Sequence, residues 1–129
     1  MKLIFITFLS MFISTLANSN DLNSRENLIA AALDDYGKVS SAWALNERCQ
    51  FVKEQEKTLF EKNISLITVA LAQDLGGPQM VYMVQASVKK TLETPKYAGC
   101  TGEPKKIFNY GYNHSKNWSD QIRRIQSKK

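Results

Sequence analysis

The chain has 129 residues, of which 43% are hydrophobic and 22% are charged, and its formal net charge at pH 7 is +5. This length suits a single domain, and two cysteines with one histidine are too few for a structural zinc site. Neither a phosphate-binding glycine pattern nor a hydrolase motif occurs, so the sequence predicts a protein that is not an enzyme and has no catalytic residues, metal or cofactor.

Residues 1–19 have the three-part pattern of a secretory signal peptide. Lys2 precedes a mostly apolar run from Leu3 to Leu16, and small residues follow around Ala17 and Ser19. The run is too short to span a bilayer comfortably. We therefore expect cleavage after Ala17 or Ser19. The remaining domain, residues 20–129, is expected to be exported without a stable membrane span, to a bacterial periplasm or alternatively to the extracellular space.

Two helices are predicted in the first part of this domain. The first begins with Ser24 as its N-cap and ends or bends at Gly37. The second runs from about Val39 to Val52, because apolar residues recur there at intervals of three and four.

A third and a fourth helix follow on either side of a glycine pair. The third covers about Lys57 to Leu75, and its apolar stripe consists of Phe60, Ile64, Ile67, Leu71 and Leu75. Gly76-Gly77 is a strong stop signal, and Pro78 suits the first turn of a helix that continues to Leu92.

The C-terminal part begins with an irregular segment from Thr94 to Gly102, after which Pro104 opens a fifth helix with a basic end. Cys100 lies in the irregular segment and Cys49 in the second helix. An isolated pair of cysteines in an oxidising compartment favours one disulfide. We therefore predict an all-α fold, a small bundle of about five helices stapled by Cys49–Cys100.

Positive charge is concentrated at the C-terminal end of the sequence. Residues 20–88 hold six Lys and Arg against nine Asp and Glu, whereas residues 89–129 hold ten against three. This asymmetry indicates a basic face for an acidic partner, although lysines on helix surfaces can also serve solubility alone. Nucleic acid is not expected as a partner of an exported protein. The acidic cleft of another protein, or an anionic surface, fits better.

Three groups of residues invite a catalytic interpretation. His114 is the only histidine, and its place on an apolar helix stripe indicates packing. Asp34-Asp35 and Glu54-x-Glu56 are paired acids such as glycosidases require. Adjacent or alternate positions on a helix point in different directions, so we expect solvated surface at both pairs.

The aromatic and basic residues after position 94 are the best candidates for binding. Tyrosine is favoured at protein interfaces, so Tyr110 or Tyr112 is expected as an exposed anchor, although Tyr112 also suits a core position. A loop held by a disulfide loses little entropy on binding. The predicted partner-binding residues are Lys96, Tyr97, Lys105, Lys106, Tyr110 and Tyr112.

The cysteine and aromatic spacing resembles that of a known family. The residues concerned are Cys49-Gln50-Phe51-Val52, Cys100-Thr101, Phe108, Trp118 and the basic tail after Ile122. This layout resembles the HdeA-type acid-stress chaperones of the bacterial periplasm. In size, export and single disulfide, the chain is also similar to periplasmic immunity proteins, which guard bacteria against effectors delivered by neighbouring cells.

These observations lead to two competing functions. We predict a periplasmic immunity protein that binds and neutralises an antibacterial effector. The partner could be a cell-wall hydrolase whose substrate cleft is acidic. Alternatively, the chain is a periplasmic acid-stress chaperone, which exposes apolar surface when acid protonates its carboxylates. A homodimer is compatible with either function.

Overall fold

The computed structural model describes residues 21–128, which form four α-helices and one short 3-10 helix without any strand. In chain order these are α2 (Asp21–Cys49), α3 (Glu54–Asp74), α4 (Gln79–Leu92), η1 (Pro95–Tyr97) and α5 (Glu103–Ser127). The all-α prediction is confirmed for this part of the chain. The predicted signal peptide, residues 1–19, lies outside the described residues.

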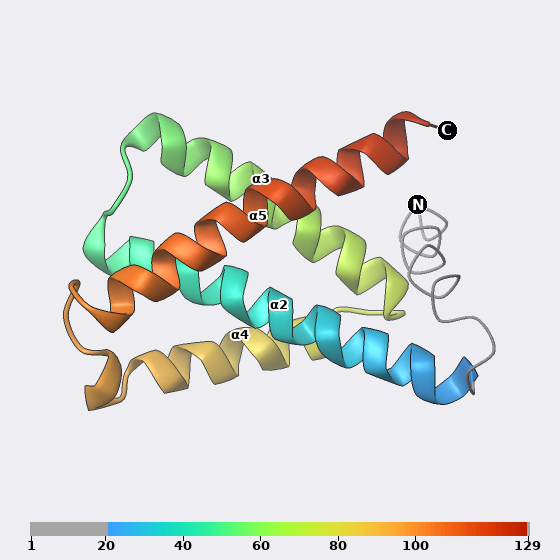
Figure 1. Cartoon of the computed structure of the whole chain (residues 1–129), viewed down its shortest axis with the longest axis horizontal. Helices are drawn as coiled ribbons and strands as arrows, with labels where there is room; N and C mark the ends of the chain where they lie inside the picture. The colour runs from blue at the N-terminus through green and yellow to red at the C-terminus, as the bar shows by residue number, and fades with distance from the viewer. Residues whose placement is uncertain (1–20, 129) are drawn as a thin grey trace.

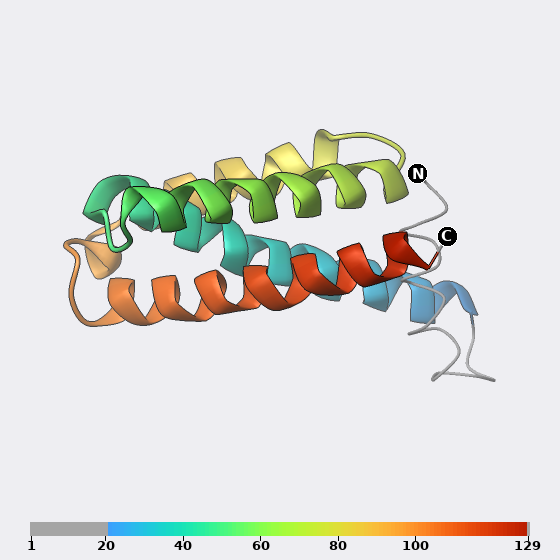
Figure 2. The same ribbon diagram turned by 90° about the horizontal axis from the view of Figure 1, so that it is seen from above.

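The helices form a bundle in which α2 and α3 each pack against both α4 and α5. In Figure 1, α5 crosses α3 while α4 runs alongside α2. Figure 2 is turned by 90° and places α3 and α4 on one side of the bundle and α5 on the opposite side. The end of α2, the start of α3, η1 and the start of α5 all meet at one end of the molecule (Figure 1).

One continuous helix, α2, stands where the sequence predicted two, so the described residues form four α-helices and not about five. Gly37 lies inside it, and a Cβ atom there would be 3.7 Å from Val84 Cγ1 of α4. A glycine inside a helix costs only about 0.5–1 kcal/mol. The full burial of Tyr36 and Val39 beside it outweighs that cost. Ser24, the predicted N-cap, also lies within α2.

The turn between α3 and α4 follows the sequence prediction. Gly76 has a φ of 80°, a left-handed conformation that glycine adopts without steric cost. The Gly77 N–H donates to the Ala72 carbonyl oxygen at 2.9 Å, and the Gly76 N–H donates to the Gln73 carbonyl oxygen at 3.3 Å. These two bonds make a Schellman motif, which satisfies carbonyl groups at the end of α3. Pro78 then precedes α4 directly.

The predicted stripe of α3 faces the core. Phe60, Ile67 and Leu71 are buried, whereas Ile64 and Leu75 are half-buried at its edges. Burying such a side chain contributes roughly 1.5–3 kcal/mol relative to leaving it exposed. The stripe therefore provides a large part of the apolar contact between α3 and its neighbours.

An aromatic cluster connects three of the helices at the loop end. Phe60 of α3 lies with its ring centroid 5.3 Å from Trp43 of α2 and 5.1 Å from Tyr112 of α5. Phe108 stacks on Tyr112 at 5.2 Å, and its ring centroid lies 4.7 Å from that of Phe51, which follows α2, with the two rings tilted. Pairs with these geometries add about 0.5–1.5 kcal/mol beyond the area that they bury.

A buried hydroxyl connects the other side of the bundle. Tyr36 of α2 is completely buried, and its hydroxyl lies 2.8 Å from Thr68 Oγ1 of α3. Gln85 of α4 donates from Nε2 to the same hydroxyl at 2.7 Å. One tyrosine thus satisfies its polar group by joining α2, α3 and α4.

Helices α2 and α5 approach each other closely at Gly111. A Cβ atom on this residue of α5 would lie 2.7 Å from the Ala42 Cβ and would collide with the Lys38 carbonyl oxygen of α2. Only glycine fits this crossing. Among residues 21–128, no helix is both long enough and apolar enough to cross a membrane.

Candidate partner-binding surface

The predicted disulfide is present at the loop end of the bundle. Cys49 at the end of α2 is bonded to Cys100, with the two Cα atoms 5.7 Å apart and a sequence separation of 51 residues. The bond ties the segment between α4 and α5 to α2. We call residues 93–102 the pinned loop. It contains η1, and both of its glycines, Gly99 and Gly102, have positive φ angles.

A second tie, Arg48, lies beside the disulfide. Its guanidinium donates to the carbonyl oxygens of Tyr97 at 2.6 Å, Gly99 at 2.8 Å and Leu92 at 3.3 Å. A planar cation with several fixed donors is suited to holding several carbonyl groups at once. Sequence reasoning did not predict this role, because the three acceptors are backbone atoms more than forty residues away.

Lys96 and Tyr97 both lie in η1 of the pinned loop. Lys96 is exposed, with its Nζ 5.4 Å from the centre of the Tyr97 ring. Tyr97 is half-buried and packs against the core. The lysine is therefore accessible to a partner, whereas much of the tyrosine side chain serves to hold the loop on the bundle.

The two lysines at the start of α5 are both exposed and point to different sides. Lys105 places its Nζ 4.3 Å from the centre of the Phe51 ring, which orients the ammonium by cation–π attraction. Lys106 lies 4.0 Å from Glu103 and lines a hollow of about 430 Å³ between α2 and α5. Tyr110 lines the same hollow.

Tyr110 and Tyr112 are separated by the helix geometry. Tyr110 is 54% exposed and stacks on His114. Tyr112 is half-buried in the aromatic cluster, with the Lys116 Nζ 4.3 Å from its ring centre. Of the two, Tyr110 has the geometry of an exposed anchor and Tyr112 that of a core residue. The six predicted residues thus surround one end of the bundle, but they do not form a single flat patch.

Lys38 of α2 adds a cation next to Tyr110, with its Nζ 5.3 Å from the ring centre. The same Nζ lies 3.1 Å from Asp34 and 3.9 Å from Asp35. Its hydrogen bond to Asp34 raises the pKa of Lys38 above the ordinary value of 10.5. Partial burial acts in the opposite direction, and Coulombic interactions with Asp34, Tyr110 and Asp35 reinforce the rise. The two acids therefore share this lysine, although adjacent helix positions were expected to point apart.

His114 is half-buried between two aromatic rings of its own helix. The Tyr110 ring lies 5.8 Å from it and the Trp118 ring 5.7 Å. Its Nε2 is 3.6 Å from the Asp35 carboxylate. This is the packing role that the sequence indicated. Within residues 21–128, no group of three or more His, Cys, Asp or Glu side chains is arranged to hold a metal ion.

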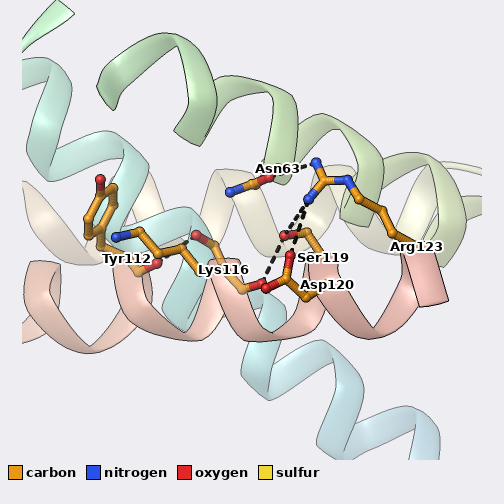
Figure 3. A network of polar contacts seen from close by, with 7 residues as sticks. Asn63, Tyr112, Lys116, Ser119, Asp120 and Arg123 are labelled. Atoms are coloured by element: carbon orange, nitrogen blue, oxygen red, sulfur yellow. Dashed lines mark hydrogen bonds and ion pairs between the residues drawn. The ribbon is translucent and has the colours of Figure 1, made fainter. Parts of the chain in front are cut away.

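The basic C-terminal end of α5 is partly used for internal contacts. Arg123 donates from Nη2 to Asn63 Oδ1 of α3 at 2.8 Å, and from Nη1 to Ser119 Oγ at 3.4 Å and Asp120 at 3.5 Å (Figure 3). Asn63 is only 3% exposed, so this arginine satisfies a buried amide. Arg123 therefore holds α5 on α3, a role that the sequence pattern did not predict. Its neighbour Arg124 is exposed.

Comparison with known proteins leaves the site to be interpreted from its own geometry. No protein-family model, no curated protein and no solved structure matches this chain.

Proposed function

We propose that this chain binds and neutralises another protein, as periplasmic immunity proteins do, by offering the pinned loop and the start of α5 to an acidic cleft. The observation that supports this proposal most is the double attachment of the pinned loop. The Cys49–Cys100 disulfide and the three Arg48 hydrogen bonds hold its backbone before any partner arrives. A loop ordered in advance costs little conformational entropy on binding.

The charge of this end complements a cleft lined by carboxylates. Lys96 in the pinned loop and Lys105 and Lys106 at the start of α5 are exposed, and Glu103 is the nearby acid that contacts Lys106. Wall-degrading glycosidases carry a pair of Asp or Glu side chains in the cleft that binds their substrate. A lysine placed between such carboxylates would compete with the substrate without any chemical step.

An exposed aromatic ring supplies the apolar part of the proposed contact. Tyr110 is 54% exposed and stands beside the hollow that Lys38, Lys106 and Ile107 also line. Tyrosine in such a position buries a large area while losing few rotamers, which is why it recurs at the centre of interfaces. We expect Tyr110, and not Tyr112, to be the aromatic anchor.

The proposal is tested with the domain of residues 20–129 as bait in a periplasmic extract. A stoichiometric partner is expected, and its affinity should fall in the triple variant Lys96→Glu, Lys105→Glu, Lys106→Glu. The matched control is Lys62→Glu, Arg124→Glu, Lys128→Glu, which changes the net charge equally at exposed positions away from the loop. The loss should be greater at low salt, because surface charges act through screened attraction. Equal losses in both triples would contradict a specific surface.

A second candidate function rests on a different feature. Met80, Tyr82 and Met83 of α4 are 43%, 60% and 70% exposed, an apolar surface of the kind that acid-stress chaperones offer to unfolding clients. Aggregation of a client protein at about pH 3, where most carboxylates are protonated, tests this alternative. Suppression that disappears in Met80→Gln, Met83→Gln would support the chaperone. If the chain neither binds a partner at neutral pH nor suppresses aggregation in acid, both proposals are overturned.

A further inference from the structure

A groove lies between α2 and α4, where Ile64 of α3 also lines it, and it reaches the pinned loop only at Glu93. Its volume is about 490 Å³, which is within the range of about 300–1,000 Å³ that is usual for small-molecule sites. Five apolar side chains line it, and they come from all three helices: Trp43, Ala44, Ile64, Val88 and Leu92.

One polar side chain in this lining has no hydrogen-bond partner. Ser40 of α2 is only 6% exposed, and its Oγ is buried without a partner among the described residues. The adjacent Ser41 behaves differently, since its Oγ donates to the Gly37 carbonyl oxygen one turn back at 2.7 Å. Thr68 and Thr58 do the same within α3. A buried hydroxyl that makes no hydrogen bond costs roughly 1–3 kcal/mol, so its place in a groove wall indicates a partner that arrives from outside.

A second polar group stands nearby and is already held in place. Gln85 of α4 also lines the groove, and its Nε2 donates to the Tyr36 hydroxyl at 2.7 Å. That bond fixes the amide and leaves its oxygen as an acceptor. The groove therefore offers one hydroxyl and one amide oxygen within an otherwise apolar lining.

The charges at the rim balance one another and select against a charged ligand. Glu47 and Glu93 stand with Arg48 and Lys89, two of each sign. Glu47 already lies 3.6 Å from Lys57, and Arg48 is occupied by the carbonyl groups of the pinned loop. An ionic head group would meet no excess of the opposite charge here.

We propose that this groove binds a small uncharged molecule with an aromatic or branched apolar body and one hydroxyl group, which hydrogen-bonds to Ser40. The body packs against Trp43, Ile64 and Leu92. The hydroxyl supplies the partner that Ser40 Oγ lacks, and Gln85 offers a second acceptor at the edge. The residues that would contact this molecule, Ser40, Trp43, Ile64, Gln85 and Leu92, all lie outside the pinned loop, so the proposal does not rest on the protein partner proposed above.

Tryptophan fluorescence tests the groove directly. The sequence has two tryptophans, and the second, Trp118, makes no hydrogen bond through its buried Nε1, so Trp118→Phe removes only apolar contacts and leaves Trp43 as the reporter. The probe is 2-naphthol, which is uncharged at neutral pH, and the matched probes are naphthalene without the hydroxyl and anionic 2-naphthoate. Saturable quenching of Trp43 by 2-naphthol is expected, with weaker binding of 2-naphthoate.

Two substitutions then separate the polar and apolar parts of the site. Ser40→Ala should lower the affinity for 2-naphthol by up to about tenfold, which corresponds to the loss of one hydrogen bond, and should leave the affinity for naphthalene unchanged. Ala44→Leu fills the groove and should abolish binding of both probes, whereas Ala86→Leu on the exposed side of α4 should not. Calorimetric titration of the unsubstituted chain gives the same affinities without Trp118→Phe. Absence of saturable binding by calorimetry, or equal 2-naphthol affinity in Ser40→Ala, would overturn the proposal.

Discussion

Arg48 donates a hydrogen bond to the carbonyl oxygen of Gly99 at 2.8 Å, and each of these residues directly precedes one of the bonded cysteines, Cys49 and Cys100. The Arg48–Gly99 hydrogen bond and the Cys49–Cys100 disulfide, which both join α2 to the pinned loop, therefore lie next to each other. The disulfide fixes how far the loop can move from α2. The guanidinium, with its two further acceptors at Tyr97 and Leu92, fixes how the loop is turned.

Replacing Arg48 by lysine should loosen the pinned loop while the disulfide stays intact. A single ammonium cannot reproduce the planar set of donors, so we expect a loss of about 1–2 kcal/mol, with the melting temperature lower by roughly 4–8 °C for each kcal/mol lost. Amide hydrogen exchange should accelerate at residues 96–100 more than in α3. Unchanged exchange in the loop would show that the disulfide alone orders it.

Replacing Gly111 by alanine should be strongly destabilising, because the new Cβ collides with the Lys38 carbonyl group and lies 2.7 Å from Ala42 Cβ. Overpacking of this kind costs about 1–3 kcal/mol or more. The matched control is Gly37→Ala, whose Cβ would be 3.7 Å from Val84, an ordinary contact. That change should stabilise α2 by about 0.5–1 kcal/mol, because alanine is the better helix residue. Chemical denaturation should show a lower free energy of unfolding for Gly111→Ala and a higher one for Gly37→Ala. A Gly111→Ala protein of undiminished stability would argue against the close crossing of α2 and α5.

Removing the Arg123 guanidinium should leave the buried Asn63 amide without its donor. Arg123→Met keeps much of the apolar stem, so the expected loss of about 1–3 kcal/mol reports mainly the unsatisfied amide. Arg124→Met is the control, since Arg124 is exposed and its neighbour carries the contact to α3. Surface changes of that type usually stay within about 0.5 kcal/mol. Equal denaturation midpoints for the two variants would contradict the structural role of Arg123.

The pKa of Lys38 predicts how its contribution to stability depends on pH. Because the folded protein holds this pKa above its ordinary value of 10.5, the contribution is fully present below that pH and is lost as the pH rises through the folded pKa. The melting temperatures of the protein and of Lys38→Met should therefore differ by a constant amount near neutral pH. The difference should shrink above about pH 10.5. A difference that grows in this range would have the wrong sign.

Much of the fold could be predicted from the sequence because its signals are local. The stripe from Phe60 to Leu75 and the stop at Gly76-Gly77 depend on helix period and backbone conformation, and both are confirmed. The cysteine pairing is confirmed as well. The predicted helix break at Gly37 is wrong. The helix propensity that one glycine costs is small compared with the free energy gained by burying Tyr36 and Val39 around it.

The candidate site was less accessible to sequence reasoning because its geometry is made by contacts between distant segments. Nothing near Arg48 in the sequence indicates that its acceptors are backbone carbonyl groups of the pinned loop. Helix period does separate Tyr110 from Tyr112. Only the packing of Tyr112 on Phe108 and Phe60, however, shows which of the two is inside. Ser40 likewise reads as an ordinary helix serine until the groove beside it is known.

Helix α4 has few buried residues, and this determines how the protein would respond to a protease. Val81 and Leu92 are its two buried residues, so α4 opens more readily than the core helices and offers the first sites for cleavage. A single cut anywhere between residues 50 and 99 leaves both fragments joined through Cys49–Cys100. Such a nicked protein keeps its full mass on a non-reducing gel and separates into two pieces only after reduction.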